Sequence, residues 1–96
     1  MKYVRVRWIH DFVDEPILIC SEVDDTSMEL RKVEIYRDGH KGFADHSEEF
    51  GDTRLSIEPW PEFEQIGSDP QFIIEFMTSN EFEEIWIKRN RPDIPK

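Results

Sequence analysis

The sequence predicts an α+β domain, with an antiparallel, mostly meandering sheet of five to six strands and a C-terminal helix packed on one face. Three observations support this prediction. The first ten residues alternate as a strand does, turn residues such as Asp38-Gly39 separate several further β-prone segments, and apolar residues near the C-terminus recur at helical spacing. With 96 residues, the chain is long enough for one modest core, so residues 1–96 are expected to form a single domain.

Residues 2–10 are expected to form the first strand. Successive strand side chains leave opposite faces of a sheet, so the strand divides into two sets. One face receives Lys2, Val4, Val6, Trp8 and His10, and the other receives Tyr3, Arg5, Arg7 and Ile9. We expect the second set to form an open sheet face, which is basic and aromatic in a chain of net charge −10.

The next three strands are expected at residues 17–23, 28–37 and 40–44. Residues 17–20 are apolar on both faces, which is typical of a central strand. In the third strand, Met28 and Leu30 are out of phase with Val33 and Ile35, which favours a β-bulge near residues 31–32. Asp38-Gly39 predicts a two-residue hairpin turn before the fourth strand.

The second half of the chain begins with residues 45–52, expected as an exposed acidic loop, and a fifth strand at residues 53–58. Pro61 suits the first position of a short helix that ends at Gly67. Residues 72–77 are β-prone and are read as a strand, although a helix is the alternative.

The final element is the clearest helix, because Thr78 and Glu81 form a capping-box pattern before its apolar face. The expected core residues are Val4, Val6, Trp8, Leu18, Cys20, Val33, Ile35, Phe72, Ile74, Phe82, Ile85 and Trp86.

Composition narrows the class of partner. Acidic residues outnumber basic ones 22 to 12, so nucleic-acid binding through the whole surface is not expected. Such a charge keeps a small protein soluble, or it complements a basic partner such as a nuclease toxin or a DNA-binding protein. No signal peptide or membrane span is expected, and the single Cys20 excludes an internal disulfide, so we expect a cytoplasmic protein.

Catalytic and cofactor patterns are weak. His10-Asp11 has two readings, an oriented base or a histidine at a strand end with a turn-capping aspartate. His40 and His46 do not follow zinc-ligand spacing, so no metal is expected. Cys20 lies in an apolar segment, and the glycines are too isolated for a phosphate loop. We therefore expect no cofactor and no enzymatic activity.

Three features are candidate binding sites. Tyr3, Arg5 and Arg7, with Lys32, Glu34 and Tyr36 from the third strand, form either a basic-aromatic platform for an anionic ligand or a solvated face of cross-strand salt pairs. Trp60, between two prolines, is either an interface anchor or a core plug. The acidic loops are the third candidate, through Asp24, Asp25, Glu48 and Glu49.

Three segments together resemble a family of small, acidic bacterial domains of unknown function. They are the opening RVRWIHD (residues 5–11), the block KVEIYRDG (residues 32–39) and the ending EFEEIW (residues 81–86). The resemblance covers nearly the whole chain but implies no catalytic residues. Small domains of this kind are similar to immunity proteins, and this step is an analogy.

The leading hypothesis is a non-enzymatic, acidic protein-binding module, of which an immunity-type inhibitor of a basic bacterial toxin is the most specific form. One alternative is a small-ligand or nucleotide-binding domain that uses the basic-aromatic sheet face. The other is a small hydrolase that uses His10 and a nearby carboxylate. A homodimer is also open, because the second strand is apolar on both faces.

Overall fold

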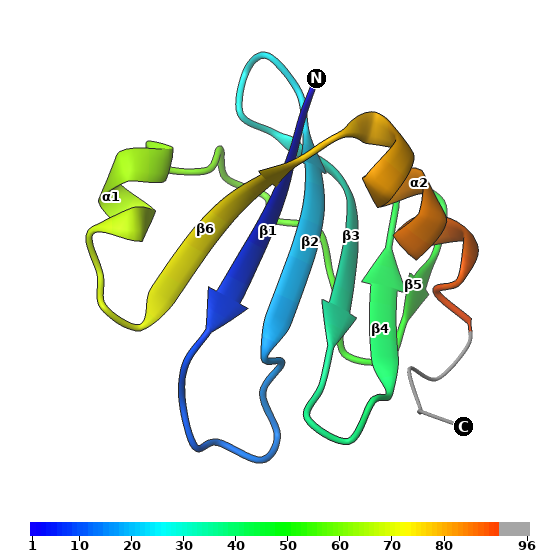
Figure 1. The fold of residues 1–96 in the computed structure, drawn as a ribbon. Helices are drawn as coiled ribbons and strands as arrows, with labels where there is room; N and C mark the ends of the chain where they lie inside the picture. Colours follow the sequence, from blue (N-terminus) through cyan, green and yellow to red (C-terminus); the bar gives the residue numbers. More distant parts are fainter. Residues whose placement is uncertain (91–96) are drawn as a thin grey trace.

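In the described part of the chain, a six-stranded antiparallel sheet and two helices make up the fold (Figure 1). The computed structural model describes residues 1–90. The elements are β1 (Lys2–Trp8), β2 (Leu18–Val23), β3 (Glu29–Ile35), β4 (Lys41–Ala44), β5 (Glu49–Phe50), α1 (Phe63–Gly67), β6 (Phe72–Met77) and α2 (Ser79–Ile87). This architecture confirms the predicted α+β class and the C-terminal helix.

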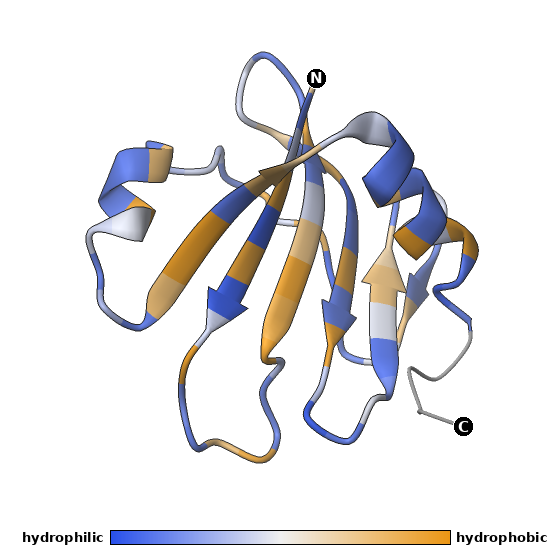
Figure 2. Ribbon diagram, viewed as in Figure 1, coloured by the Kyte–Doolittle hydropathy of each residue, from blue (hydrophilic) through white to orange (hydrophobic). Residues whose placement is uncertain are grey.

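The strands lie in the order β5-β4-β3-β2-β1-β6. Strands β1 to β5 form a meander, and β6 then returns along the outer side of β1 (Figure 1). Hydropathy along the ribbon shows apolar residues concentrated in β2 and β6, whereas the connecting loops are mostly hydrophilic (Figure 2). The strand prediction for residues 72–77 is confirmed, and so is the short helix that ends at Gly67.

The predicted strand at residues 53–58 is wrong. Within residues 45–58 the fifth strand is Glu49–Phe50 instead, inside a segment that was expected to be a loop, and residues 53–62 cross the back of the sheet without regular structure (Figure 1). The alternation of Leu55 and Ile57 suggested a strand, yet Ile57 is 89% exposed. Polar side chains of β3, described below, bind this crossing segment and take the place of a neighbouring strand.

Helix α2 covers the sheet face that was expected to be open. Its capping box is present as predicted, with Thr78 accepting from the Glu81 N–H at 3.1 Å and the Glu81 carboxylate accepting from the Thr78 N–H at 2.8 Å. Phe82, which is fully buried, packs with Cys20 and Met77 over the centre of the sheet. Tyr3 lies against Phe82, with 5.5 Å between ring centroids. The face of Tyr3 is therefore a core face.

Arginine side chains fasten α2 to the strands beneath it. The Arg31 Nε donates to the Glu22 carboxylate at 2.7 Å, and the same guanidinium pairs with Glu83 on the helix. Its centre lies 4.9 Å from the Phe82 ring, which adds a cation–π contact. Arg89 makes a similar bridge further along, since it lies 4.2 Å from the Trp86 ring and pairs with Glu48 at 3.1 Å. Ion pairs and cation–π contacts thus attach α2 to the rest of the fold.

A register shift in the β2–β3 pair confirms the predicted irregularity and moves it slightly. Glu22 pairs with Arg31 and Val23 pairs with Glu29, so Leu30 is the extra residue. In a regular strand, residues 29 and 32 would point to opposite faces. The bulge brings Glu29 and Lys32 onto one face, the face opposite α2.

The predicted core is confirmed in part. Val4, Val6, Cys20, Val33 and Phe82 are buried as expected, whereas the other predicted core residues remain partly exposed. Four buried hydrophobic residues were not predicted, namely Val23, Phe43, Ala44 and Met77.

Candidate protein-binding surface

The structure separates the residues of the predicted basic-aromatic platform. Arg5 pairs with Cys20, and Cys20 pairs with Val33, so these three residues share the α2 face. Lys32 and Glu34 alternate with Val33 and therefore point to the opposite face. Tyr36 lies beyond the end of β3. The prediction of one shared face was wrong, because the strand register aligns Arg5 with Val33 and so turns Lys32 and Glu34 to the other face.

Two of the three platform residues on β1 have structural partners. Tyr3 packs under α2, and Arg5 donates to Glu75 on β6 at 2.5 Å. This ion pair raises the pKa of Arg5 and lowers that of Glu75. Arg7 differs from both, because it is exposed near the end of β1.

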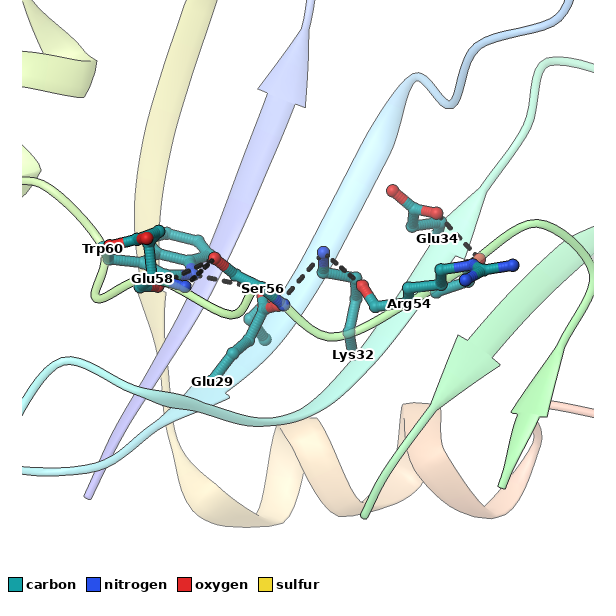
Figure 3. A network of polar contacts seen from close by, with 9 residues as sticks. Glu29, Lys32, Glu34, Arg54, Ser56, Glu58 and Trp60 are labelled. Atoms are coloured by element: carbon teal, nitrogen blue, oxygen red, sulfur yellow. Dashed lines mark hydrogen bonds and ion pairs between the residues drawn. The ribbon is translucent and has the colours of Figure 1, made fainter. Parts of the chain in front are cut away.

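The opposite face brings together Lys32 and Trp60, two of the predicted site residues, through a residue that sequence reasoning missed. Glu29 lies between them with its side chain only 1% exposed (Figure 3). Its carboxylate accepts from the Trp60 indole N–H at 3.0 Å and from the Ser56 backbone N–H at 2.7 Å. It also accepts from Ser21 Oγ at 3.0 Å and pairs with Lys32 Nζ at 3.0 Å.

This network binds the crossing segment to the sheet. Lys32 also donates to the Arg54 carbonyl at 3.0 Å, and Thr53 donates to Glu34 at 2.7 Å. An adjoining pocket of about 310 Å³ has mostly apolar walls that include Trp60, Ile66 and Phe72. The Trp60 indole N–H is thus bonded to a buried carboxylate, and its partly exposed side chain lines this pocket. The phase slip in β3 was the only sequence signal that could have placed Glu29 beside Lys32.

The predicted acidic residues lie at one end of the sheet. Asp24 and Asp25 lie in the β2–β3 connection, Glu48 lies in the β4–β5 connection, and Glu49 begins β5. Asp24 accepts from the hydroxyl and N–H of Thr26 and from the Met28 N–H, and these bonds lower its pKa. Asp25 lies 3.5 Å from the N-terminal amine, and Glu48 pairs with Arg89. Most of the negative charge at this end is thus engaged within the protein, with Glu49 exposed beside it.

The other end of the sheet presents a different kind of acidic surface. Residues 9–17 join β1 to β2 and form the large loop at the foot of Figure 1. Asp11, Asp14 and Glu15 are all exposed, and no side-chain bond or ion pair joins them to another residue in the described part of the chain. Phe12 is 60% exposed and Val13 80% exposed beside them. Apolar side chains with a charged surround are the usual makeup of a protein-binding patch.

His10 forms hydrogen bonds within this loop. Its Nδ1 accepts from the Phe12 N–H at 3.0 Å, which leaves Nε2 to donate to the Pro16 carbonyl at 2.7 Å. The imidazole lies 4.3 Å from the Trp8 ring, and Arg37 donates to the His10 carbonyl at 2.6 Å. Both ring nitrogens therefore serve the loop, and neither is bonded to Asp11.

Two hollows flank the loop. One, of about 600 Å³, is lined by Trp8 and residues 11–15. The other, of about 420 Å³, lies between the loop and the β3–β4 turn, with walls that include Tyr36, His40 and Asp52. We call the exposed residues of the 9–17 loop, together with Tyr36, His40 and Asp52, the loop-end surface. This surface combines exposed apolar side chains, carboxylates and two hollows.

Metal-binding groups and membrane-spanning helices are two further features to consider in residues 1–90. Within these residues no three His, Cys, Asp or Glu side chains are grouped so that they could hold a metal ion. Neither α1 nor α2 has the length and apolar character needed to cross a membrane.

Comparison with known proteins agrees with a family whose function is undefined. No curated protein and no solved structure matches the chain with significance. A family described as a domain of unknown function, DUF6881, matches residues 2–91. Because this match spans nearly the whole sequence, the chain belongs to the DUF6881 family.

Proposed function

We propose that this domain is a non-enzymatic module that binds a basic protein through the loop-end surface. The observation that carries the proposal is the 9–17 loop, where three carboxylates without internal partners surround exposed Phe12 and Val13. The net charge of −10 adds a negative electrostatic field around the whole molecule to the local field of these three carboxylates. An acidic field speeds the approach of a basic partner, and buried apolar anchors slow its departure.

The hydrogen bonds of the loop support the same function. A binding loop that is ordered beforehand loses little conformational entropy when its partner arrives. His10 and Arg37 supply that order with three hydrogen bonds. The most specific form of the proposal is an immunity-type inhibitor, in which the loop-end surface covers the basic active site of a toxin.

The test uses the full chain as bait in lysate of its native cells, at salt from about 50 to about 500 mM. We expect a protein of basic pI to be captured and its retention to fall as salt rises. The triple variant Asp11→Asn, Asp14→Asn and Glu15→Gln should lose the partner. Its matched control neutralises three exposed acids near α1, Glu58→Gln, Glu62→Gln and Glu64→Gln, and should retain most of the binding.

With the partner purified, Phe12→Ala should weaken binding by about 30-fold, as expected for an anchor worth about 2 kcal/mol. If the partner is a toxin, an equimolar amount of the domain should abolish its activity. Equal loss of binding in the two triple variants would contradict the assigned surface. Capture that is indifferent to salt, or no basic partner at all, would contradict the proposed function.

A further inference from the structure

The outer edge of β6 is the second unexplained surface, and it is independent of the loop-end surface. Strand order places β6 at one edge of the sheet, next to β1 only. At the other edge, β5 has just two residues, whereas β6 has six. A long exposed edge strand is a template for another strand unless proline, lysine or a bulge protects it. The sequence of β6, FIIEFM, contains no proline or lysine, and its pairing with β1 is regular.

The backbone of β6 alternates in direction. The Ile9 N–H donates to the Gln71 carbonyl at 2.7 Å, so odd-numbered residues of this antiparallel pair direct their polar backbone groups toward β1. Even-numbered residues direct theirs outward. The Phe72 N–H is bonded to the Asp69 carbonyl, which leaves Ile74 and Phe76 to present their backbone groups at the edge.

The pattern of side chains on β6 is nearly symmetric about Ile74. If a second copy pairs antiparallel across a two-fold axis at this residue, Ile74 meets Ile74 and Phe72 meets Phe76 on one face. On the other face, Ile73 meets Glu75. The strand is apolar enough for this contact, since Ile73 is 44% exposed and Phe76 is 63% exposed. α1 contacts β6 through Phe63 on Phe76, from the face opposite Arg5.

Charges in this register are complementary. Arg7 pairs with Ile73 across β1 and β6, and Arg5 pairs with Glu75. The dimer then has a row of four side chains across its sheet. Two come from the first copy, Arg7 and Ile73, and the next two come from the second copy, Glu75 and then Arg5. Each Glu75 therefore has its own Arg5 on one side and Ile73 of the other copy on the other side, and Arg7 of that copy lies one strand further along the same row. The alternative register, centred on Glu75, would set the two Glu75 side chains against each other.

The geometry points to self-association of this domain through β6, giving a two-fold dimer with one continuous sheet of twelve strands. The occupant of the edge is a second copy, because the apolar pattern and the charges complement themselves. This basis differs from the earlier expectation of a dimer through strand 2. In the structure β2 is central, and its residues 20–23 are buried on both faces.

Salt should strengthen this dimer. Two chains of net charge −10 repel each other, and the β6 edge is short and largely apolar, so screening removes more repulsion than attraction. The opposite dependence is expected for capture of a basic partner. The two proposals therefore fail separately, since one is tested by self-association and the other by binding of a different protein.

The experiment measures the molar mass of the full chain by sedimentation, up to about 1 mM protein and from low to high salt. We expect a monomer–dimer equilibrium that shifts toward the dimer as salt rises. Ile73→Glu should weaken the dimer at least about tenfold, because the new carboxylate faces Glu75 of the second copy. Ile73→Lys, which removes the same apolar side chain but faces that carboxylate with a cation, should retain it.

Two further measurements separate loss of pairing from loss of folding. Position 73 lies opposite Arg7 within the monomer, so Ile73→Glu gains an opposite charge there and Ile73→Lys a like charge. The far-ultraviolet circular dichroism of both variants should match the parent, and thermal unfolding should show both folded at the temperature of sedimentation, with Ile73→Lys the less stable of the two. The amide protons of Ile74 and Phe76 should exchange more slowly as protein concentration rises. A monomer at every concentration and salt, or a dimer equally tolerant of both substitutions, would overturn the proposal. So would a dimer that leaves the exchange of these two amides unchanged.

Discussion

The two faces of the sheet are covered by different means. On one face, helix α2 packs Phe82 against Cys20 and Met77, which is ordinary apolar burial. On the other, an irregular segment is held by a buried carboxylate, Glu29, and by Lys32. The reason is that a helix satisfies its own backbone groups, whereas an irregular segment does not. A sheet face covered by a loop must therefore supply polar side chains, and here the β3 bulge delivers them.

The largest expected loss of stability comes from a substitution on the face that α2 covers. Phe82→Ala removes a ring that is 0% exposed and leaves a cavity under α2. It should lower the free energy of unfolding by about 3–5 kcal/mol. Urea unfolding checks this value, with Ile57→Ala, at an exposed position, as the control. A loss below about 1 kcal/mol would mean that α2 contributes little to the core.

The next largest loss of stability is expected from a substitution on the face that residues 53–62 cover. Lys32→Met leaves the Glu29 carboxylate buried without its cation, although three hydrogen bonds to Glu29 remain. The free energy of unfolding should fall by about 2–3 kcal/mol. Amide exchange at Ser56 and indole exchange at Trp60 should accelerate more than exchange in α2. Lys88→Met, on an exposed lysine, should change neither; a global acceleration would show that the two faces unfold as one unit.

A third prediction concerns how the stability of the α2-covered face depends on pH. Arg31 lowers the pKa of Glu22 beneath α2, from an ordinary value of 4.5. A lowered native pKa gives stability that is present above 4.5 and is lost as the pH falls through the native value. Glu22→Gln should therefore cost about 1.5 kcal/mol at neutral pH and progressively less below 4.5. Urea titrations across this range test the trend, and a constant difference at every pH would contradict it.

The smallest effect concerns the start of α2. Thr78→Ala removes the hydroxyl that accepts from the Glu81 N–H. The expected loss of unfolding free energy is about 1 kcal/mol, with faster amide exchange confined to the first turn. Thr78→Ser keeps the acceptor and should recover most of the loss. If Thr78→Ser is as unstable as Thr78→Ala, the methyl group and not the cap is responsible.

The sequence was sufficient to predict elements that depend on local chemistry. The alternation of β1 and the capping box of α2 were each readable from neighbouring residues, and each is present. A turn is also present at Asp38-Gly39, but the predicted two-residue form is wrong: the bond from the Tyr36 N–H to the His40 carbonyl closes a three-residue loop, in which Gly39 and not Asp38 has a positive φ. Strand ends differed by one or two residues, as expected where hydrogen bonding fades. The order of β2 to β5 follows from their short connections, because such connections make consecutive strands neighbours.

Predictions that depended on long-range choices succeeded less well. Periodicity shows that β1 has two faces, but it cannot show which face α2 will cover, because Tyr3 and Val4 are both able to enter a core. Leu55 and Ile57 alternate as in a strand, yet Glu29 and Lys32 capture that segment from a distance of more than twenty residues. Likewise the acidic segments were visible as composition, but only the fold shows that Asp24 is used in its own turn while Asp14 is not.

The position of Cys20 has a practical consequence. The thiol lies on a central strand beneath α2, fully buried, and burial raises its pKa to about 11. A thiol in this state does not react with alkylating reagents while the sheet and helix remain joined. The rate at which Cys20 is alkylated therefore measures how often the core opens. It needs no engineered label, and it could follow how tightly a bound partner keeps the domain closed.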